Sequence, residues 1–301
     1  METDGVAPFI FNTTPSLVFE PGASRRFGAI AGPRLGRSVL FVTDPGLRRL
    51  GLCDAALASL EAAGIAATVF DEVEADPSRD TLMRAVEAGR KAGATGVAGF
   101  GGGSSLDVAK LAALLIGSGE DLDNAWGVGQ AKGPRLPLAL APTTAGTGSE
   151  VTPVSIITVG EEEKRGVSSP AILPDIAVLD AELTLGLPPA ITAATGIDAM
   201  VHAIEAYASK NPNNNPLSRM LAREALRLLG ANIETAVSDG KNLAARSAML
   251  LGSMLAGQAF ANSPVAAVHA LAYPVGGTFH VPHGLSNALV LPHVLRFNAP
   301  Q

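Results

Sequence analysis

The patterning that most restricts the fold is an alternation of short apolar runs with amphipathic stretches up to about residue 186. The expected strands cover 38–43, 67–71, 96–100, 136–141, 154–159 and 175–179, and the expected helices cover 46–63, 79–92 and 104–117. Strands that alternate with helices predict a parallel sheet covered by helices, an α/β fold. We also expect residues 8–20 to form a β-hairpin at the edge of this sheet.

From Leu187-Pro188-Pro189 onward the sequence predicts helices only, over 189–209, 217–238, 241–261, 264–273 and 284–296. Pro264 suits the first turn of its helix, and Pro274 is expected to end that helix. A chain of 301 residues is long enough for two domains. We therefore expect an α/β domain over residues 1–186 and an all-α domain over residues 187–301.

The composition excludes several classes of protein. Hydrophobic residues make up 47 % of the chain and charged residues 17 %, which is typical of a well-buried globular protein. A net charge of −6 gives no reason to expect nucleic acid as a partner. The single cysteine, Cys53, excludes an internal disulfide framework. Without a signal-peptide pattern or an apolar run long enough for a membrane span, the sequence predicts a cytoplasmic protein with no membrane partner.

A glycine-rich loop follows the expected strand 96–100 and opens a helix. It comprises Gly101, Gly102, Gly103 and Ser104. Glycines let the backbone approach a phosphate closely, and the free N–H groups at a helix start attract its charge. The alternative is a plain tight turn in which Ser104 and Asp107 form a capping box.

A second polar loop follows the next strand and carries Thr143, Thr144 and Thr147. Loops at the carboxyl ends of adjacent parallel strands form the crevice in which α/β sheets bind ligands. These hydroxyls suit a bound cofactor, or they satisfy their own backbone in a turn. Asp44, at the end of the first strand, either accepts hydrogen bonds from an adenosine ribose or caps the next helix.

All five histidines of the chain lie in its last hundred residues: His202, His269, His280, His283 and His293. Asp198 and His202 are four residues apart, so they share one face of a helix. One carboxylate with three imidazoles, from His202, His269 and His283, suits Fe²⁺ or Zn²⁺. Any one of these histidines, taken alone, is more readily a hydrogen-bonded structural residue.

Five segments resemble the iron-containing (group III) alcohol dehydrogenases, in the order of that family and over nearly the whole chain. They are GFGGGSSLDVAK (99–110), PTTAGTGSEVT (142–152), LPDIAVLDAELTLGLPP (173–189), ATGIDAMVHAIEAY (194–207) and AVHALAYPVGGTFHVPHGLSNALVLPHV (267–294). The resemblance implies a Rossmann-like dinucleotide-binding domain with a parallel sheet, followed by an all-α metal-binding domain. The active site is then expected between the two domains.

The resemblance also implies roles for single residues. The metal ligands map onto Asp198, His202, His269 and His283. The cofactor-binding residues map onto Asp44, Gly101, Gly102, Gly103, Ser104, Asp107, Thr143, Thr144, Thr147 and Lys164, with Asp44 favouring NAD and Lys164 near the nicotinamide ribose.

Two departures from the family pattern affect these expectations. Many members carry a histidine, linked to proton transfer, four residues after the third ligand, where this chain has Tyr273. Tyr273 and His280 are therefore the catalytic candidates for proton transfer. Members also continue with further helices past the segment 291–294, so the resemblance implies that the helical domain of this chain is truncated.

The expected function is hydride transfer between NAD(H) and a small alcohol, aldehyde or ketone at a divalent metal, Fe²⁺ or Zn²⁺, which acts as a Lewis acid. The alternatives are a relative that resembles glycerol dehydrogenases or maleylacetate reductases, and a shortened paralogue without catalytic activity. The complete ligand set disfavours the maleylacetate branch. We expect a homodimer, because the N-terminal hairpin offers a sheet edge to a second subunit.

Overall fold

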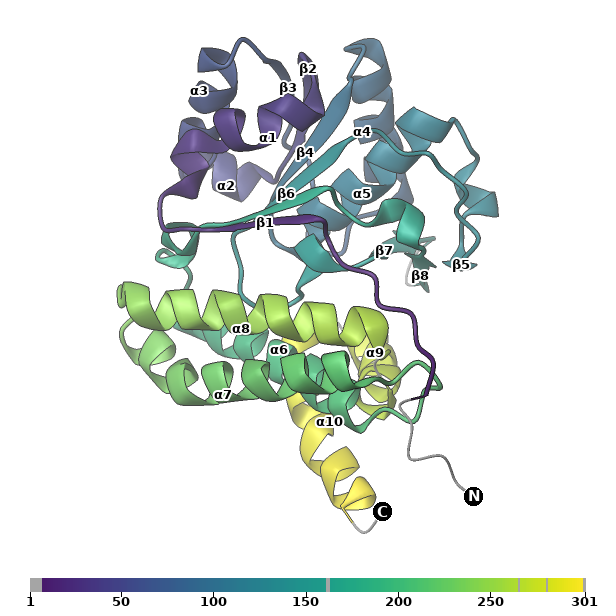
Figure 1. The fold of residues 1–301 in the computed structure, drawn as a ribbon, viewed down its shortest axis with the longest axis vertical. Coiled ribbons are helices and arrows are strands. Elements are labelled where there is room, and N and C mark those ends of the chain that lie inside the picture. Colours follow the sequence, from purple (N-terminus) through teal and green to yellow (C-terminus); the bar gives the residue numbers. More distant parts are fainter. Residues whose placement is uncertain (1–6, 161–162, 265, 280, 300–301) are drawn as a thin grey trace.

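The computed structural model describes residues 7–160, 163–264, 266–279 and 281–299. Figure 1 shows two layers stacked along the long axis, an α/β layer and a layer of helices. Within those described ranges, no helix combines the length and the hydropathy that a membrane span requires.

The α/β layer is built on a six-stranded sheet with the order β1-β9-β6-β4-β2-β3. All of its pairings are parallel, which confirms the expected fold class. Its strands are β1 (Ser16–Phe19), β2 (Ser38–Val42), β3 (Ala66–Phe70), β4 (Gly96–Gly101), β6 (Leu138–Pro142) and β9 (Ile176–Leu179).

Helices cover both faces of this sheet because its strands are apolar on both sides. On β2, Val39 and Phe41 belong to the core under α1 and α3, whereas Leu40 and Val42 belong to the core under α4 and α5. The helices of this layer are α1 (Phe27–Leu35), α2 (Pro45–Arg49), α3 (Asp54–Ala62), α4 (Arg79–Lys91) and α5 (Gly103–Ser118). Short 3₁₀ turns are η1 (Ala23–Arg26), η2 (Leu122–Asn124), η3 (Ser149–Val151), η4 (Pro170–Ile172) and η5 (Ala181–Thr184).

A second, three-stranded sheet lies beside the first and was not expected as a separate sheet. Its order is β5-β8-β7, with strands β5 (Gly127–Val128), β7 (Val154–Val159) and β8 (Glu163–Ser168). The strand at 154–159 therefore exists but pairs antiparallel with β8 instead of joining the parallel sheet. The pattern of β8 was missed because charged residues occupy half of this strand.

Two local predictions in the α/β layer are wrong. Residues 8–20 form no hairpin: only β1 is a strand, and it lies at the sheet edge parallel to β9. The expected helix 46–63 is two helices, because the chain turns between α2 and α3 at Gly51, which has φ +70°.

The second layer contains α6 (Pro189–Ala208), α7 (Pro216–Ser238), α8 (Leu243–Asn262), α9 (Ala267–Phe279) and α10 (His283–Asn298). Alanines dominate the core of α6, α7 and α8, which lets these helices pack closely. Both proline predictions for α9 are wrong: Pro264 lies outside the helix, which begins at Ala267, and Pro274 does not end it, since α9 continues to Phe279. A proline inside a helix removes its own backbone N–H and its ring crowds the carbonyl four residues earlier, but this can kink a helix without ending it.

The chain connects the two layers twice. The second connection lies between η5 and α6, near the expected domain limit at 186, which stays a prediction. The first connection precedes β1, where Asn213 Oδ1 accepts the Ile10 N–H (2.8 Å) and Asn262 Oδ1 accepts the Asn12 N–H (2.6 Å). Residues 10–12 therefore lie against the helical layer, as the trace in Figure 1 shows, while β1 lies in the sheet.

Between the layers, two glycines allow close backbone contact. Gly148 has φ +61°, and a Cβ at this residue would lie 2.6 Å from Cα of Gly257 on α8. The loop between β6 and β7 therefore packs directly on the helical layer.

Candidate active site

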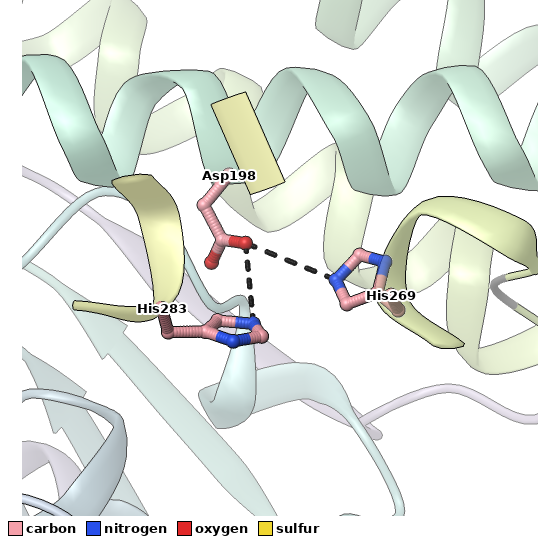
Figure 2. Close-up of side chains that lie close together, drawn as sticks. All are labelled: Asp198, His269 and His283. Carbon is pink, nitrogen blue, oxygen red and sulfur yellow. Dashed lines mark ion pairs between the residues drawn. The ribbon is translucent and has the colours of Figure 1, made fainter. Parts of the chain in front are cut away.

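Three side chains from three helices converge at one point of the helical layer. Asp198 lies on α6, His269 on α9, and His283 is the first residue of α10. Their potential ligand atoms all lie within 4.8 Å of one another. Oδ1 of Asp198 lies 3.8 Å from Nε2 of His269 and 3.5 Å from Nε2 of His283, as drawn in Figure 2.

His202 lies one helical turn after Asp198, beside this group and not within it. Its ring stacks on Phe260, with ring centroids 4.5 Å apart, and on His269, with centroids 4.7 Å apart. Nδ1 of His202 is buried and has no hydrogen-bond partner among the described residues. A buried nitrogen without a partner of good geometry is costly, so a ligand at this ring would satisfy it. The backbone of Gly146 also lies close enough to act on the pKa of the ring, which it raises against the larger lowering by burial.

The protonation states of this cluster suit a metal ion. Burial lowers the pKa of His202 to about 4 and also lowers the pKa of His283. Burial alone would raise the pKa of Asp198, but the neighbouring imidazoles, His202 foremost, outweigh it and lower this pKa. An ionised carboxylate beside neutral imidazoles is the state in which these groups bind divalent iron or zinc, so the residues fit such an ion.

Two further side chains contact the cluster, and the sequence analysis missed both. Nδ2 of the buried Asn287 donates to Oδ1 of Asp198 (2.6 Å) and lies 3.3 Å from Nε2 of both His269 and His283. Oε2 of Glu205 lies 2.6 Å from Nδ1 of His269. One signal was available, because Asp198, His202 and Glu205 follow the i, i+4, i+7 spacing of a single helix face.

The glycine-rich loop lies at the carboxyl end of β4 and leads directly into α5. At Gly101, which has φ +156°, a Cβ would lie 2.7 Å from Cβ of Ser105, so only glycine fits. Gly102 is the N-cap of α5 and makes no side-chain cap bond, which leaves the first N–H groups of the helix free for an anion.

The alternative capping box of Ser104 and Asp107 is not formed. Asp107 instead accepts hydrogen bonds from Oγ of Ser149 (2.6 Å) and from the backbone N–H of Ile156 (2.9 Å). The buried Lys110, also missed from the sequence, donates to Oγ of Ser149 (2.6 Å) and to the carbonyl of Val154 (2.6 Å). Asp107 and Lys110 thus hold the second polar loop and β7 against α5.

The threonines of the second loop differ in exposure. Thr143 is buried and Thr144 is half-buried, whereas Thr147 lines the cavity described below. Oγ1 of Thr147 accepts the backbone N–H of Ser149 (3.2 Å), so this hydroxyl also satisfies its own loop.

The remaining candidates have different surroundings. Asp44 is the N-cap of α2 and accepts the N–H of Leu47 (2.9 Å), as its alternative interpretation predicts. Lys164 on β8 lines the cavity and forms an ion pair with Asp76. Tyr273 stacks on His283 with ring centroids 5.6 Å apart, and burial raises the pKa of its phenol to about 12. His280 lies outside the described residues.

One cavity of about 350 Å³ joins the two groups of residues. Gly103, Ser104 and Thr147 line one side of it, and Asp198, His202, His269 and His283 line another. Phe260 and Tyr273 add aromatic wall. The anion-binding helix start and the candidate metal ligands therefore face the same space.

Known proteins match this chain over most of its length. A model described as iron-containing alcohol dehydrogenase matches residues 14–181, and the C-terminal model of the Fe-containing alcohol dehydrogenase family matches residues 192–301. A long-chain-alcohol dehydrogenase 1 of Geobacillus thermodenitrificans is 43 % identical over 93 % of this chain and 73 % of its own length.

Solved structures agree with these matches. A 1,3-propanediol oxidoreductase superposes with a TM-score of 0.93 and 38 % identity, covering 97 % of this chain and 76 % of that protein. A sulfoacetaldehyde reductase from Bifidobacterium kashiwanohense, solved in complex with NAD⁺, gives a TM-score of 0.87 at 30 % identity, over 97 % of this chain and 77 % of its own.

Proposed function

The chain belongs to the iron-containing alcohol dehydrogenase family, and from this premise we propose that the cavity between its two layers is the active site. The protein is an oxidoreductase that transfers hydride between NAD(H) and an alcohol or aldehyde. The observation that carries the proposed site is the single cavity lined by both the start of α5 and the Asp198–His269–His283 cluster.

We propose Asp198, His202, His269 and His283 as the metal ligands. When bound, the metal supplies a Lewis acid for the substrate oxygen, and NAD(H) accepts or donates the hydride. His202 lies beside the group of three, and its assignment as the fourth ligand is supported by the family match, by its place one turn after Asp198 on α6 and by its buried Nδ1.

The cofactor diphosphate is proposed to bind at the start of α5, where Gly101, Gly102, Gly103 and Ser104 leave backbone N–H groups free. Thr143, Thr144, Thr147 and Lys164 remain candidates for the rest of the cofactor, and Asp44 for its ribose. Asp107 accepts its hydrogen bonds from Ser149 and Ile156, so we propose that it fixes the second polar loop and β7 against α5 and does not itself bind the cofactor.

For the substrate we propose a small aliphatic alcohol or aldehyde. Val154, Ile156, Phe260 and Pro264 contribute apolar wall to the cavity, and Phe260 stacks on His202. Such a wall favours contact with a carbon chain, because polar groups held against it would lose their water.

The test measures NADH oxidation at 340 nm, a standard readout for this cofactor, with protein loaded with Fe²⁺ or Zn²⁺ and a series of unbranched aldehydes. We expect turnover that requires metal, and metal bound at one ion per chain by elemental analysis. His269→Ala is the matched control and should lose the ion while the far-ultraviolet circular dichroism is retained. Full metal occupancy in His269→Ala would show that the ligand assignment is wrong.

Two further properties belong to this proposal. We propose a homodimer formed at the edge strand β1, where Leu17 and Phe19 are partly exposed; sedimentation at a monomer mass would contradict it. We propose a cytoplasmic location, supported by the lone cysteine, Cys53, and tested by cell fractionation.

A further inference from the structure

We propose that Glu205 is a positioning residue that fixes the tautomer of His269 and so directs the Nε2 lone pair of that ring toward the ligand cluster. This inference rests on the proposed metal centre. Glu205 lies on α6, one turn beyond His202, and only 5 % of it is exposed. Buried carboxylates are uncommon without a partner, and this one faces the first turn of α9 with both oxygens.

Each oxygen of Glu205 has its own contact. Oε1 accepts the backbone N–H of Val268 at 2.6 Å. Oε2 lies 2.6 Å from Nδ1 of His269. A carboxylate carries no hydrogen to donate, so the hydrogen of the second contact belongs to Nδ1 of His269.

The other nitrogen of the ring then has a defined state. A neutral imidazole holds one hydrogen, so Nε2 of His269 carries a lone pair. Nε2 faces the amide nitrogen of Asn287 at 3.3 Å, and this amide can only donate. Glu205 therefore requires the tautomer in which Nε2 can bind a metal, and the amide of Asn287, whose one remaining hydrogen faces Nε2 of both His269 and His283, is compatible with it.

Without the carboxylate, the ring is free to adopt the opposite tautomer. Its Nε2–H would then point at the ligand cluster and would have to be displaced before a metal could bind. Removing an outer partner that orients a metal-binding histidine typically costs about 10–100-fold in metal affinity.

Glu205→Gln tests this directly, because it retains the shape of the side chain. The Val268 N–H still needs an oxygen, so the new amide NH₂ group faces Nδ1 of His269 and donates to it. We expect the tautomer to invert. The ¹⁵N chemical shifts of the His269 ring in metal-free protein report which nitrogen carries the hydrogen, with His269→Ala used to assign the signals.

The second readout is the dissociation constant for Zn²⁺, measured by competition with a chelator. We expect Glu205→Gln to weaken Zn²⁺ binding about 10–100-fold. Val268→Pro is the control for the backbone contact: it removes the N–H donor together with the buried valine side chain, it leaves Glu205 and His269 in place, and proline is tolerated in the first turn of a helix. This control should retain the wild-type tautomer and bind Zn²⁺ within about threefold of wild type.

The outcomes separate the inference from the function it rests on. If wild type binds no divalent ion but shows Nδ1–H at His269, the metal centre fails and the role of Glu205 in setting the tautomer stands. If wild type shows Nε2–H, or if Glu205→Gln leaves tautomer and Zn²⁺ affinity unchanged, the inference about Glu205 is overturned. Equal loss of affinity in Glu205→Gln and Val268→Pro would make Glu205 an anchor of α9 only. If Glu205→Gln does not fold, the ¹⁵N spectrum of the wild type still shows which nitrogen of His269 carries the hydrogen and so decides the inference.

Discussion

Glu150 is a buried acid next to the cofactor side of the cavity. Only 1 % of it is exposed, and its Oε1 has no hydrogen-bond partner within the described part of the chain. Burial raises its pKa from 4.5 to about 7, so folding disfavours its ionised form. Such a group lowers the free energy of unfolding at pH values above its pKa in the folded state. It has no effect at pH values below its pKa in the unfolded state.

We therefore predict that Glu150→Gln is more stable than the wild type by an amount that grows with pH. Below pH 4.5 the wild-type acid is protonated in both states, and the two proteins should have similar free energies of unfolding. As the pH rises from 4.5 to 7, the variant should become the more stable one, by up to about 3 kcal/mol above pH 7. Urea titrations at pH 4.5, 6 and 8 measure this. A difference that does not change with pH would show that Glu150 is not a titrating buried acid.

At Tyr273 the question is whether the phenol takes part in proton transfer. With a pKa of about 12, raised by burial, it stays protonated at neutral pH and can only serve as a donor. We predict that Tyr273→Phe lowers kcat for aldehyde reduction about 10²-fold and leaves the metal content unchanged. Steady-state kinetics with elemental analysis measures both. If the variant keeps the wild-type rate, Tyr273 takes no part in proton transfer and only lines the cavity.

Among the elements, the contact of α8 with the loop between β6 and β7 depends on glycine. A Cβ at Gly257 would lie 2.9 Å from both Cα and O of Gly148, and neither backbone can yield cheaply. We predict that Gly257→Ala lowers the free energy of unfolding by at least about 1 kcal/mol, in spite of the better helix propensity of alanine.

Gly230→Ala is the control for this prediction. Gly230 lies inside α7, and a Cβ there would meet nothing within 4 Å. The same substitution should raise the free energy of unfolding by about 0.5–1 kcal/mol through helix propensity alone. Urea titration of both variants measures the contrast. If both were stabilised, the close approach of Gly148 and Gly257 would not be a real constraint.

The sequence predicted best those elements whose signals are local. Four of the five helices from 189 onward were predicted to within two residues at each end, since apolar periodicity is a local signal, whereas α9 starts three residues later and ends six residues later than predicted. The hairpin at 8–20 failed because side chains some 200 residues away, on Asn213 and Asn262, bind the backbone of that segment. No local pattern contains such a contact.

In the candidate site, too, residues with a local sequence signal were predicted and residues that act across the fold were missed. Asp198 and His202 were found from spacing on one helix, and His269 and His283 from their residue type and the family resemblance. Glu205, Asn287 and Lys110 were missed, because each acts on a side chain or loop that only the folded chain brings near. Asn287, for example, contacts Asp198 across 89 residues.

For the whole molecule, the proposed metal ligands join three helices that are separate in sequence. An ion that binds only where these helices meet should stabilise the folded state. At a free concentration about 100-fold above its dissociation constant, Zn²⁺ should add about 2.7 kcal/mol to the free energy of unfolding. Urea titration with Zn²⁺ or with chelator measures the difference, and His269→Ala should show none. Equal midpoints for wild type in both conditions would contradict a shared ion.

The two crossings of the chain between the layers also bear on how the cavity opens. Two layers joined by a single connecting segment can rotate about any axis relative to one another. With two connecting segments, the easy rotation is the one about the line that joins the two segments. Any twist or shear across that line would have to stretch the backbone before β1 or break its anchoring to Asn213 and Asn262. Together with the close packing of Gly148 on Gly257, these two attachments leave few directions in which one layer can turn relative to the other.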